Sequence, residues 1–244
     1  ITAIAQGNFS DLITLKTSQE RADQFTLKVT DDISLDKTNS LNSLTSSSVA
    51  LAKVKDIFSN IVEINSLTPE NSLDGIFINS AEITVTDTVD NAKSTTLNSF
   101  TSDKVIINDI NDNYENILNI ESQKVTQDST DGLDISNSTI TVNDSISLDK
   151  VNIINTFTQG TITLEFFADT LTKTESLRNI PFDSVDTTNT KLTINDVVSF
   201  EDIKNSILFL EQEYPSLELT EVVDSYENIV QLENSLLDGT TDVI

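Results

Sequence analysis

Short stretches of the chain alternate apolar and polar residues, and each stretch closes on one residue that serves as its anchor. Apolar residues stand four and two places before the anchor, as in Ile83 and Val85. A period of two predicts a β-strand with one buried face. Two kinds of stretch follow each other in turn. The first kind has the anchors Asp31, Asp87, Asp144 and Asp196, and the second kind has the anchors Lys53, Asp109, Phe166 and Glu221.

After each anchor the apolar residues recur at three-residue steps, as in Tyr114, Ile117 and Ile120. This spacing predicts a short helix with one apolar stripe. Phe58, Tyr114 and Tyr226 occupy the same place on that stripe. We therefore expect these rings to pack in the core and not to form a row that binds sugars.

One strand–helix segment of each kind makes up a repeat of about 56 residues, and the repeat returns four times. Because each segment has an apolar face that only a neighbour can cover, the pattern predicts an α/β fold organised as a solenoid-like repeat array of strand–short helix units. The predicted parts are a partial repeat or connecting strand at 1–24 and repeats at 25–80, 81–137, 138–190 and 191–244, the last with the start of a further turn.

Polar residues at fixed places predict where the helices and turns begin. Three places after each anchor stands a Ser or Asp, which we expect to cap its own helix by accepting from free N–H groups of the first turn. The Asp-Gly pairs at 74–75 and 131–132 predict turns with positive φ, each followed by a short extra strand at 75–80 or 132–138, with 180–182 in the same place of the third repeat. The predicted N-cap residues are Ser34, Asp56, Asp90, Asp112, Ser147, Asp169, Ser199 and Asp224.

Charge and residue types argue against several functions. The chain has 40 acidic and 14 basic residues, a formal net charge of −26, and no basic cluster, so we expect no binding to nucleic acid. No apolar run has the length of a membrane span. His and Cys are absent, which removes Ser-His-Asp sites, Cys-His sites and ordinary zinc sites. A hydrolase with two carboxylates remains an alternative, but acids that recur in each repeat favour a structural role, and we predict that the chain is not an enzyme.

Two acidic segments carry the oxygen-bearing side chains that hard cations prefer. Neither has the spacing of an EF-hand or the glycine-rich repeats of a calcium β-roll, and helix caps and turns account for the same residues. Calcium is therefore a candidate ligand, and no other cofactor is predicted. The candidate ligands are Asp109, Asn111, Asp112 and Asn113 in one segment and Asp128, Asp131 and Asp134 in the other.

The strand sequences Ile-Thr-Val-Thr-Asp at 83–87 and Ile-Thr-Val-Asn-Asp at 140–144 each precede a short predicted helix in an acidic chain without Cys. They resemble the tandem-repeat regions of large bacterial secreted surface proteins, such as S-layer proteins and giant adhesins exported by type I secretion. The likeness covers residues 25–237. It implies an extracellular place on the bacterial cell surface and calcium as a frequent partner, although the glycine-rich secretion repeats of such proteins do not occur in this sequence.

We therefore predict a secreted structural protein that builds a cell-surface layer, filament or stalk by self-association, so that its main partner is another copy of itself. The alternative is an adhesin module that binds a glycan or a host protein on one face of the stack. Exposed aromatic or polar residues in one repeat only would distinguish the adhesin. Pro215 and residues 181–190 are the irregular places where such a site is expected.

Overall fold

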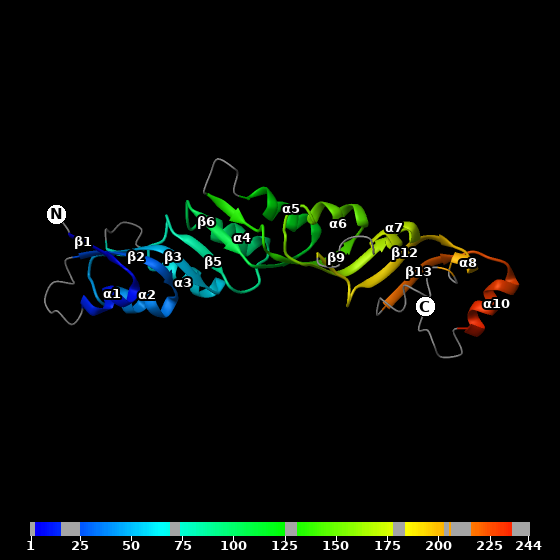
Figure 1. Cartoon of the computed structure of the whole chain (residues 1–244), viewed down its shortest axis with the longest axis horizontal. Coiled ribbons are helices and arrows are strands. Elements are labelled where there is room, and N and C mark those ends of the chain that lie inside the picture. The colour runs from blue at the N-terminus through cyan, green and yellow to red at the C-terminus, as the bar shows by residue number, and fades with distance from the viewer. Residues whose placement is uncertain are drawn as a thin grey trace. The chain divides into compact units, whose positions relative to one another are not determined.

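The computed structural model describes residues 3–15, 25–68, 74–124, 131–177, 184–202, 205 and 216–235. The chain divides into two compact units (Figure 1). Unit 1 comprises Ile1–Ile110 and Leu118–Ile135, and unit 2 comprises Asn111–Ile117 and Ser136–Ile244. Each unit contains a sheet of parallel strands joined by short helices.

Strands alternate with helices along the described chain, except that two strands follow one another at four places. Before residue 136 the elements are β1 (Ala3–Gly7), α1 (Phe9–Ile13), β2 (Phe25–Ile33), α2 (Leu35–Asn42), β3 (Ser48–Asp56), α3 (Phe58–Ser66), β4 (Gly75–Phe77), β5 (Glu82–Val85), α4 (Asn91–Asn98), β6 (Lys104–Ile107), β7 (Asp109–Asp112), α5 (Tyr114–Ser122) and β8 (Gly132–Asp134). After it they are β9 (Thr139–Ile146), α6 (Leu148–Ile154), β10 (Ile162–Asp169), α7 (Leu171–Leu177), β11 (Val185–Asp186), β12 (Lys191–Val198), α8 (Phe200–Asp202), β13 (Ser216–Val222) and α10 (Tyr226–Ser235). The two successive strands are β4–β5, β6–β7, β8–β9 and β11–β12.

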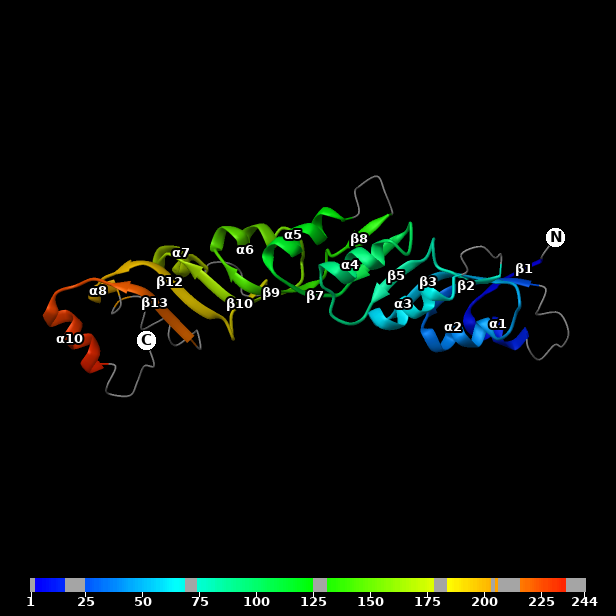
Figure 2. The same cartoon turned by 180° about the vertical axis from the view of Figure 1, so that it is seen from behind.

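The first sheet has the strand order β1-β2-β3-β5-β6-β8, with β4 beside β3, and its paired strands are parallel. Parallel neighbours need a crossover connection, which here is usually a helix. Helix α2 contacts both α1 and α3, so consecutive helices lie side by side, as Figures 1 and 2 show. Leu27 and Val29 on β2 are aligned with Val49 and Leu51 on β3, and all four are buried. Their burial confirms the period of two.

The second sheet has the order β13-β12-β10-β9-β7, with β11 beside β10. Ile140 and Val142 on β9 are aligned with Ile162 and Leu164 on β10, and these four side chains are buried. Helices α6 and α7 contact each other, as the helices of unit 1 do. The same strand–helix construction therefore recurs in both units.

On one side, β3 and β10 each pair with two strands in succession instead of one. Strand β3 pairs with β4 through Ser48–Ala50 and with β5 through Lys53–Asp56. Strand β10 pairs in the same way with β11 and then β12. Gly75 and Gly132, which begin β4 and β8, have φ of 125° and 130°, which confirms the predicted Asp-Gly turns. Residues 180–182 lie outside the described part, and β11 is the short strand that follows them.

The structure confirms the α/β class with parallel sheets of strand–helix segments. The boundaries of the four repeats and their stacking into a solenoid stay predictions. None of the described helices combines the length and the apolar composition that crossing a membrane would require.

One prediction about the core is wrong. Tyr114 is buried and Phe58 is half-buried, but Tyr226 is 79% exposed and Ile229 on the same helix is 42% exposed. Strand β13 is the last in its sheet, and no described strand lies beyond it. Tyr226 is exposed because the stripe of α10 has no following segment to cover it among the described residues.

Candidate functional site

The contacts that join successive strand–helix segments recur along the chain, and the main one is a carboxylate. Among the described residues, six Asp side chains accept a hydrogen bond from the N–H of the first residue of the preceding helix. The pairs, with N to carboxylate oxygen distances, are Phe9 with Asp31 at 2.9 Å, Leu35 with Asp56 at 2.8 Å, Phe58 with Asp87 at 2.6 Å, Tyr114 with Asp144 at 2.9 Å, Leu148 with Asp169 at 2.9 Å and Leu171 with Asp196 at 2.8 Å.

A β-bulge positions the acids that close the first kind of strand. Strand β9 advances three residues, from Val142 to Ser145, while its partner β10 advances two, from Leu164 to Phe166. The extra residue lies at Asn143 and Asp144, and the same shift occurs around Asp31 and around Asp196. A bulge can re-aim a side chain out of the regular alternation. Here it accompanies an Asp whose carboxylate reaches the preceding helix.

The acids of the second kind of strand connect two helices with one carboxylate. Asp56 Oδ1 accepts from Ile57 N and Asn60 Nδ2 at the start of its own helix, while Oδ2 accepts from Leu35 N of the helix before. Asp169 is 8% exposed and makes the same connection, from Thr170 N to Leu148 N. Each of these carboxylates therefore ties its own helix to the one before.

The predicted N-caps are only partly correct. Asp90 accepts from Lys93 N at 2.8 Å and Ser199 Oγ from Asp202 N at 3.2 Å, as expected. Ser34 and Ser147 are N-cap residues but make no capping bond through their side chains. The prediction is wrong for the four remaining residues, because in each case the residue that follows is the N-cap. These residues are Asp56, Asp112, Asp169 and Asp224. At the first three of them the strand extends to the predicted residue itself.

A lysine covers the ring at the start of three helices. The ammonium of Lys37 lies 5.6 Å from the centre of the Phe9 ring, Lys93 lies 5.6 Å from Phe58, and Lys150 lies 4.4 Å from Tyr114. Each lysine is the third residue of the helix that follows the ring. Each such contact contributes about 0.5 to 1 kcal/mol at an exposed site.

The helices α7 and α8 form a fourth described pair of this type, and they have neither the aromatic residue nor the lysine. Helix α7 begins with Leu171 in place of an aromatic residue, and the third residue of α8 is Asp202 in place of lysine. In these four described pairs of helices, the ring and the lysine are therefore both present three times and both replaced once. We infer that the ring and the lysine act as a pair.

Electrostatics explains why the acids stand where they do. The N-terminus of a helix carries a partial positive charge, and a carboxylate that accepts a helix N–H stabilises it by about 1 kcal/mol. The acids at successive junctions use this effect, so part of the large negative charge is matched by helix N-termini. Burial is the main reason that the pKa of Tyr114 lies above its usual range, and the negative charge of Glu115 adds to it.

Buried threonines lie after the helix in several strand–helix segments and form hydrogen bonds there. Thr45 Oγ1 donates to Phe25 O at 3.0 Å, Thr101 to Ala81 O at 2.7 Å, and Thr158 to Ser138 O at 2.6 Å. Each hydroxyl also accepts from the N–H two residues further along. Each threonine therefore ties the end of one segment to the first residue of the strand of that segment or to the residue just before it.

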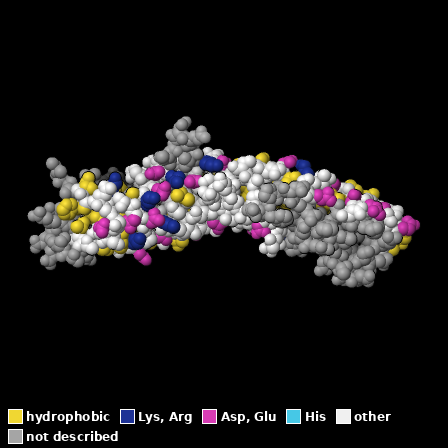
Figure 3. All heavy atoms as spheres, in the orientation of Figure 1, with side chains coloured by type: hydrophobic (Ala, Val, Ile, Leu, Met, Phe, Trp, Pro, Cys, Tyr) yellow, Lys and Arg dark blue, Asp and Glu magenta, His cyan; other side chains and the backbone are white. Residues whose placement is uncertain are grey.

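Unit 1 also has a row of alternating charges across its strands. Lys53 Nζ lies 3.3 Å from Glu82 Oε1, and Lys104 Nζ lies 3.7 Å from Glu82 Oε2 and 3.4 Å from Asp134 Oδ2. Figure 3 shows basic and acidic side chains intermixed on the visible surface of this unit. Exposed ion pairs contribute little each. Their alternation matches one strand to the next and helps to set the register.

The residues predicted to bind calcium serve mainly in hydrogen bonds within the protein. Asp109 Oδ2 accepts from Thr88 Oγ1, and Asn111 Oδ1 accepts from Asn143 Nδ2. Asp112 Oδ1 accepts from Asn113 N and Asn116 Nδ2, and Asn113 Oδ1 accepts from Asn116 N.

The second predicted calcium segment is only partly described. Asp131 is exposed, Asp134 pairs with Lys104, and Asp128 lies outside the described residues. No three acidic side chains in the described part of the chain are grouped closely enough to hold a metal ion. Calcium binding by these residues stays a prediction.

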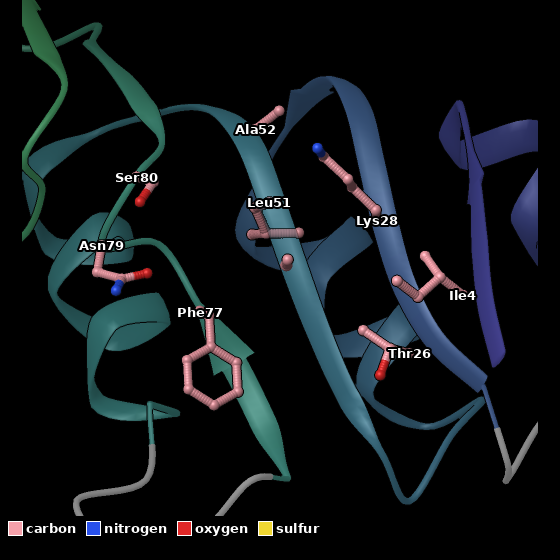
Figure 4. A pocket seen from close by; sticks show the side chains of 9 residues that line it. Ile4, Thr26, Lys28, Leu51, Ala52, Phe77, Asn79 and Ser80 are labelled. Carbon is pink, nitrogen blue, oxygen red and sulfur yellow. The ribbon is translucent and has the colours of Figure 1, made fainter. Parts of the chain in front are cut away.

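A shallow hollow of about 430 Å³ lies on the sheet of unit 1 (Figure 4). Phe77 and Asn79 border it on one side and Lys28 and Ile4 on the other, with Leu51 on β3 between them. The sequence did not point to it. Pro215 and residues 181–183 of the predicted irregular sites lie outside the described part. Residues 184–190 form β11 and a turn, where Thr188 Oγ1 donates to Asp186 Oδ1 at 2.6 Å.

The sequence pattern did not predict the two kinds of residue that join successive segments, the anchor acids and the lysines. The sequence shows that the anchors Asp31, Asp87, Asp144 and Asp196 recur, but it does not indicate what they bind. Lys37, Lys93 and Lys150 recur at the repeat spacing and were not singled out. Their period was the signal that could have found them. A comparison with protein families, curated proteins and solved structures found no match to this chain.

Proposed function

We propose that the chain is a structural, non-enzymatic protein of the bacterial cell surface, which builds a layer, filament or stalk by self-association and is organised as a solenoid-like array of repeats. The observation that carries this proposal is that one set of contacts recurs at successive junctions. The Asp carboxylate on the preceding helix is found six times in the described residues, in both units. Residues committed to a reaction have no reason to recur in this way, whereas joints between building units do.

Light scattering of the purified chain over a range of concentrations, with electron microscopy of the same samples, tests the assembly. We expect ordered polymers or sheets that grow with protein concentration. Parallel samples with calcium and with a chelator test the calcium prediction, which expects calcium to promote assembly. A chain that stays monomeric at all concentrations, with and without calcium, would contradict assembly.

The extracellular location needs a separate test. Antibodies raised against the chain should label intact cells of the source bacterium, and mild protease treatment of those cells should remove the label. Labelling only after the cells are broken would contradict the surface location and would leave the assembly result unaffected.

The hollow of unit 1 favours the adhesin alternative, in which the chain binds a glycan. Phe77 borders the hollow, and the residues at the corresponding register positions of β8 and β11 are Asp134 and Asp186, so among the described strands of this kind only β4 carries the aromatic residue. An aromatic ring beside polar groups is a surface on which a sugar can stack. A glycan array with the chain and with Phe77→Asp tests this function. Binding that is lost in the variant, with an unchanged circular dichroism spectrum, supports the adhesin.

A further inference from the structure

Helices α5 and α10 begin with the same four residues, Tyr-Glu-Asn-Ile, at 114–117 and 226–229. Their local structure matches as well. Asp112 Oδ1 accepts from Asn113 N and Asn116 Nδ2, and Asp224 Oδ1 accepts from Ser225 N and Asn228 Nδ2. The two helix starts are therefore the same structure in two places.

The surroundings of the two rings differ. Tyr114 is 5% exposed, its N–H donates to Asp144, and the ammonium of Lys150 lies over its ring. Both partners come from the next strand–helix segment, β9 with α6. Tyr226 is 79% exposed, and no described residue accepts a hydrogen bond from its N–H or places a cation over its ring. Tyr226 is thus a fourth ring of the Phe9, Phe58 and Tyr114 series without its partners.

The strand beside α10 is incompletely covered too. Leu219 and Val222 on β13 are half-buried, although Ile194 and Val198, their partners in register on β12, are buried. Strand β13 is also the terminal strand of its sheet. We call Leu219, Val222, Tyr226 and Ile229, the apolar residues of β13 and α10 that are half-buried or exposed, the α10 face; no described strand pairs with the far edge of β13.

We propose that the α10 face binds a strand–helix segment of the first kind that carries both the acid and the lysine, such as residues 139–154. The incoming strand pairs in parallel with β13. An Asp placed like Asp144 accepts the Tyr226 N–H, and a lysine placed like Lys150 lies over the ring. This inference rests on the proposed function, since it names the surface through which such a chain joins another unit.

The occupant is a segment with both the acid and the lysine, and the segment at β1 does not supply them. Residues 3–8, which form β1 and the N-cap of α1, contain no acid, and the third residue of α1 is Asp11. Helix α1 begins with Phe9, whose ring is itself covered by Lys37. The segment of β1 and α1 is therefore of the kind that carries a covered ring, and not of the kind that supplies the lysine. End-to-end docking of a second copy through β1 would therefore leave Tyr226 without its partners.

The probe is a synthetic peptide of residues 138–155, and the readout is hydrogen exchange of the full chain together with peptide binding. We expect the peptide to slow exchange over 219–230 and to leave 114–117 unchanged. Peptides with Asp144→Asn or with Lys150→Gln should bind about 5- to 10-fold more weakly, because each loses one contact of about 1 kcal/mol.

Two protein variants make the test specific. Tyr226→Ser should abolish peptide protection, and the chain should fold because the ring is exposed. Ile153→Ser, at a residue that is 43% exposed on α6, is the matched control and should bind the peptide as the parent chain does. Equal binding by the Tyr226→Ser variant, or no protection of 219–230 by a monomeric peptide, would overturn the proposal.

A second copy as the occupant gives a different result. Protection of 219–230 that follows the concentration of the chain itself, with none from the peptide, would assign the face to end-to-end contact and overturn the proposed occupant. Polymers without peptide binding would sink this inference and leave the proposed function standing. Peptide binding by a chain that stays monomeric would support this inference and contradict the proposed self-association.

Discussion

Helix α5 and helix α10 start with identical residues, yet one buries its first ring and the other exposes it. Both helices form and both receive the same carboxylate contact from the preceding Asp. What differs is the segment on the far side, which is β9 with α6 for Tyr114 and is missing among the described residues for Tyr226. The comparison teaches that the local sequence makes the helix, while a neighbour decides what the helix buries.

The largest expected effect is on the two rings themselves. Tyr114→Ala should lower the free energy of opening of α5 by about 3 to 5 kcal/mol, because a buried aromatic side chain is lost. Tyr226→Ala should change that of α10 by no more than about 0.5 kcal/mol, because its ring is exposed. Native-state hydrogen exchange of the amides in each helix measures both. Similar losses at the two sites would mean that the exposure of Tyr226 is not its state in solution.

The next largest effect is expected from a substitution that disturbs the packing of β9 and α6, the segment that covers α5. A Cβ added to Gly160 would lie 2.2 Å from Ser138 O, at the point where β9 begins. Gly160→Ala should therefore destabilise unit 2 by about 1 to 3 kcal/mol and speed exchange at Tyr114, as overpacking against backbone does. In the matched control, Gly7→Ala, the nearest atom is at an ordinary 3.5 Å, and little change is expected. Equal melting shifts in the two variants would contradict the close contact.

The carboxylate alone should have a smaller effect. Asp144→Ala removes the acceptor of the Tyr114 N–H and should cost about 1 kcal/mol in urea unfolding, with Asp144→Asn in between. Glu175→Gln, at an exposed residue of α7, removes the same charge without a capping contact and is the control. If the Glu175 and Asp144 variants lose the same stability, net charge and not the helix contact is responsible.

The smallest effect is the dependence on alkaline pH. The pKa of Tyr114 is raised, mainly by burial, so the unfolded chain ionises this hydroxyl at lower pH than the folded chain does. The contribution of Tyr114 is therefore complete below the ordinary tyrosine pKa and is lost as the pH rises towards the raised value. Thermal unfolding of the parent chain and of Tyr114→Phe across this pH range measures it. A parent chain that loses no more stability than the variant would contradict the shift.

Much of the fold followed from the sequence pattern. The alternation around Ile140 and Val142 predicted a strand, the three-residue steps from Tyr114 predicted a helix, and Asp74-Gly75 predicted a turn, because these features depend on neighbours within a few residues. The N-cap predictions failed at Asp56 and Asp169, whose strands run one residue further. The partners of these acids are 21 residues away, beyond the reach of local pattern.

The sequence by itself determined which segments are strands, which are helices and which side of each is apolar, since those depend on periodicity and short-range sterics. Only the tertiary structure decided that Asp31, Asp87, Asp144 and Asp196 cap the preceding helix and that lysines cover the rings of Phe9, Phe58 and Tyr114. It also decided that Tyr226 is exposed where Tyr114 is buried. The physical reason is that a carboxylate, an ammonium or a ring acts on whatever lies within a few ångströms, and in this chain that neighbour is supplied by the next segment.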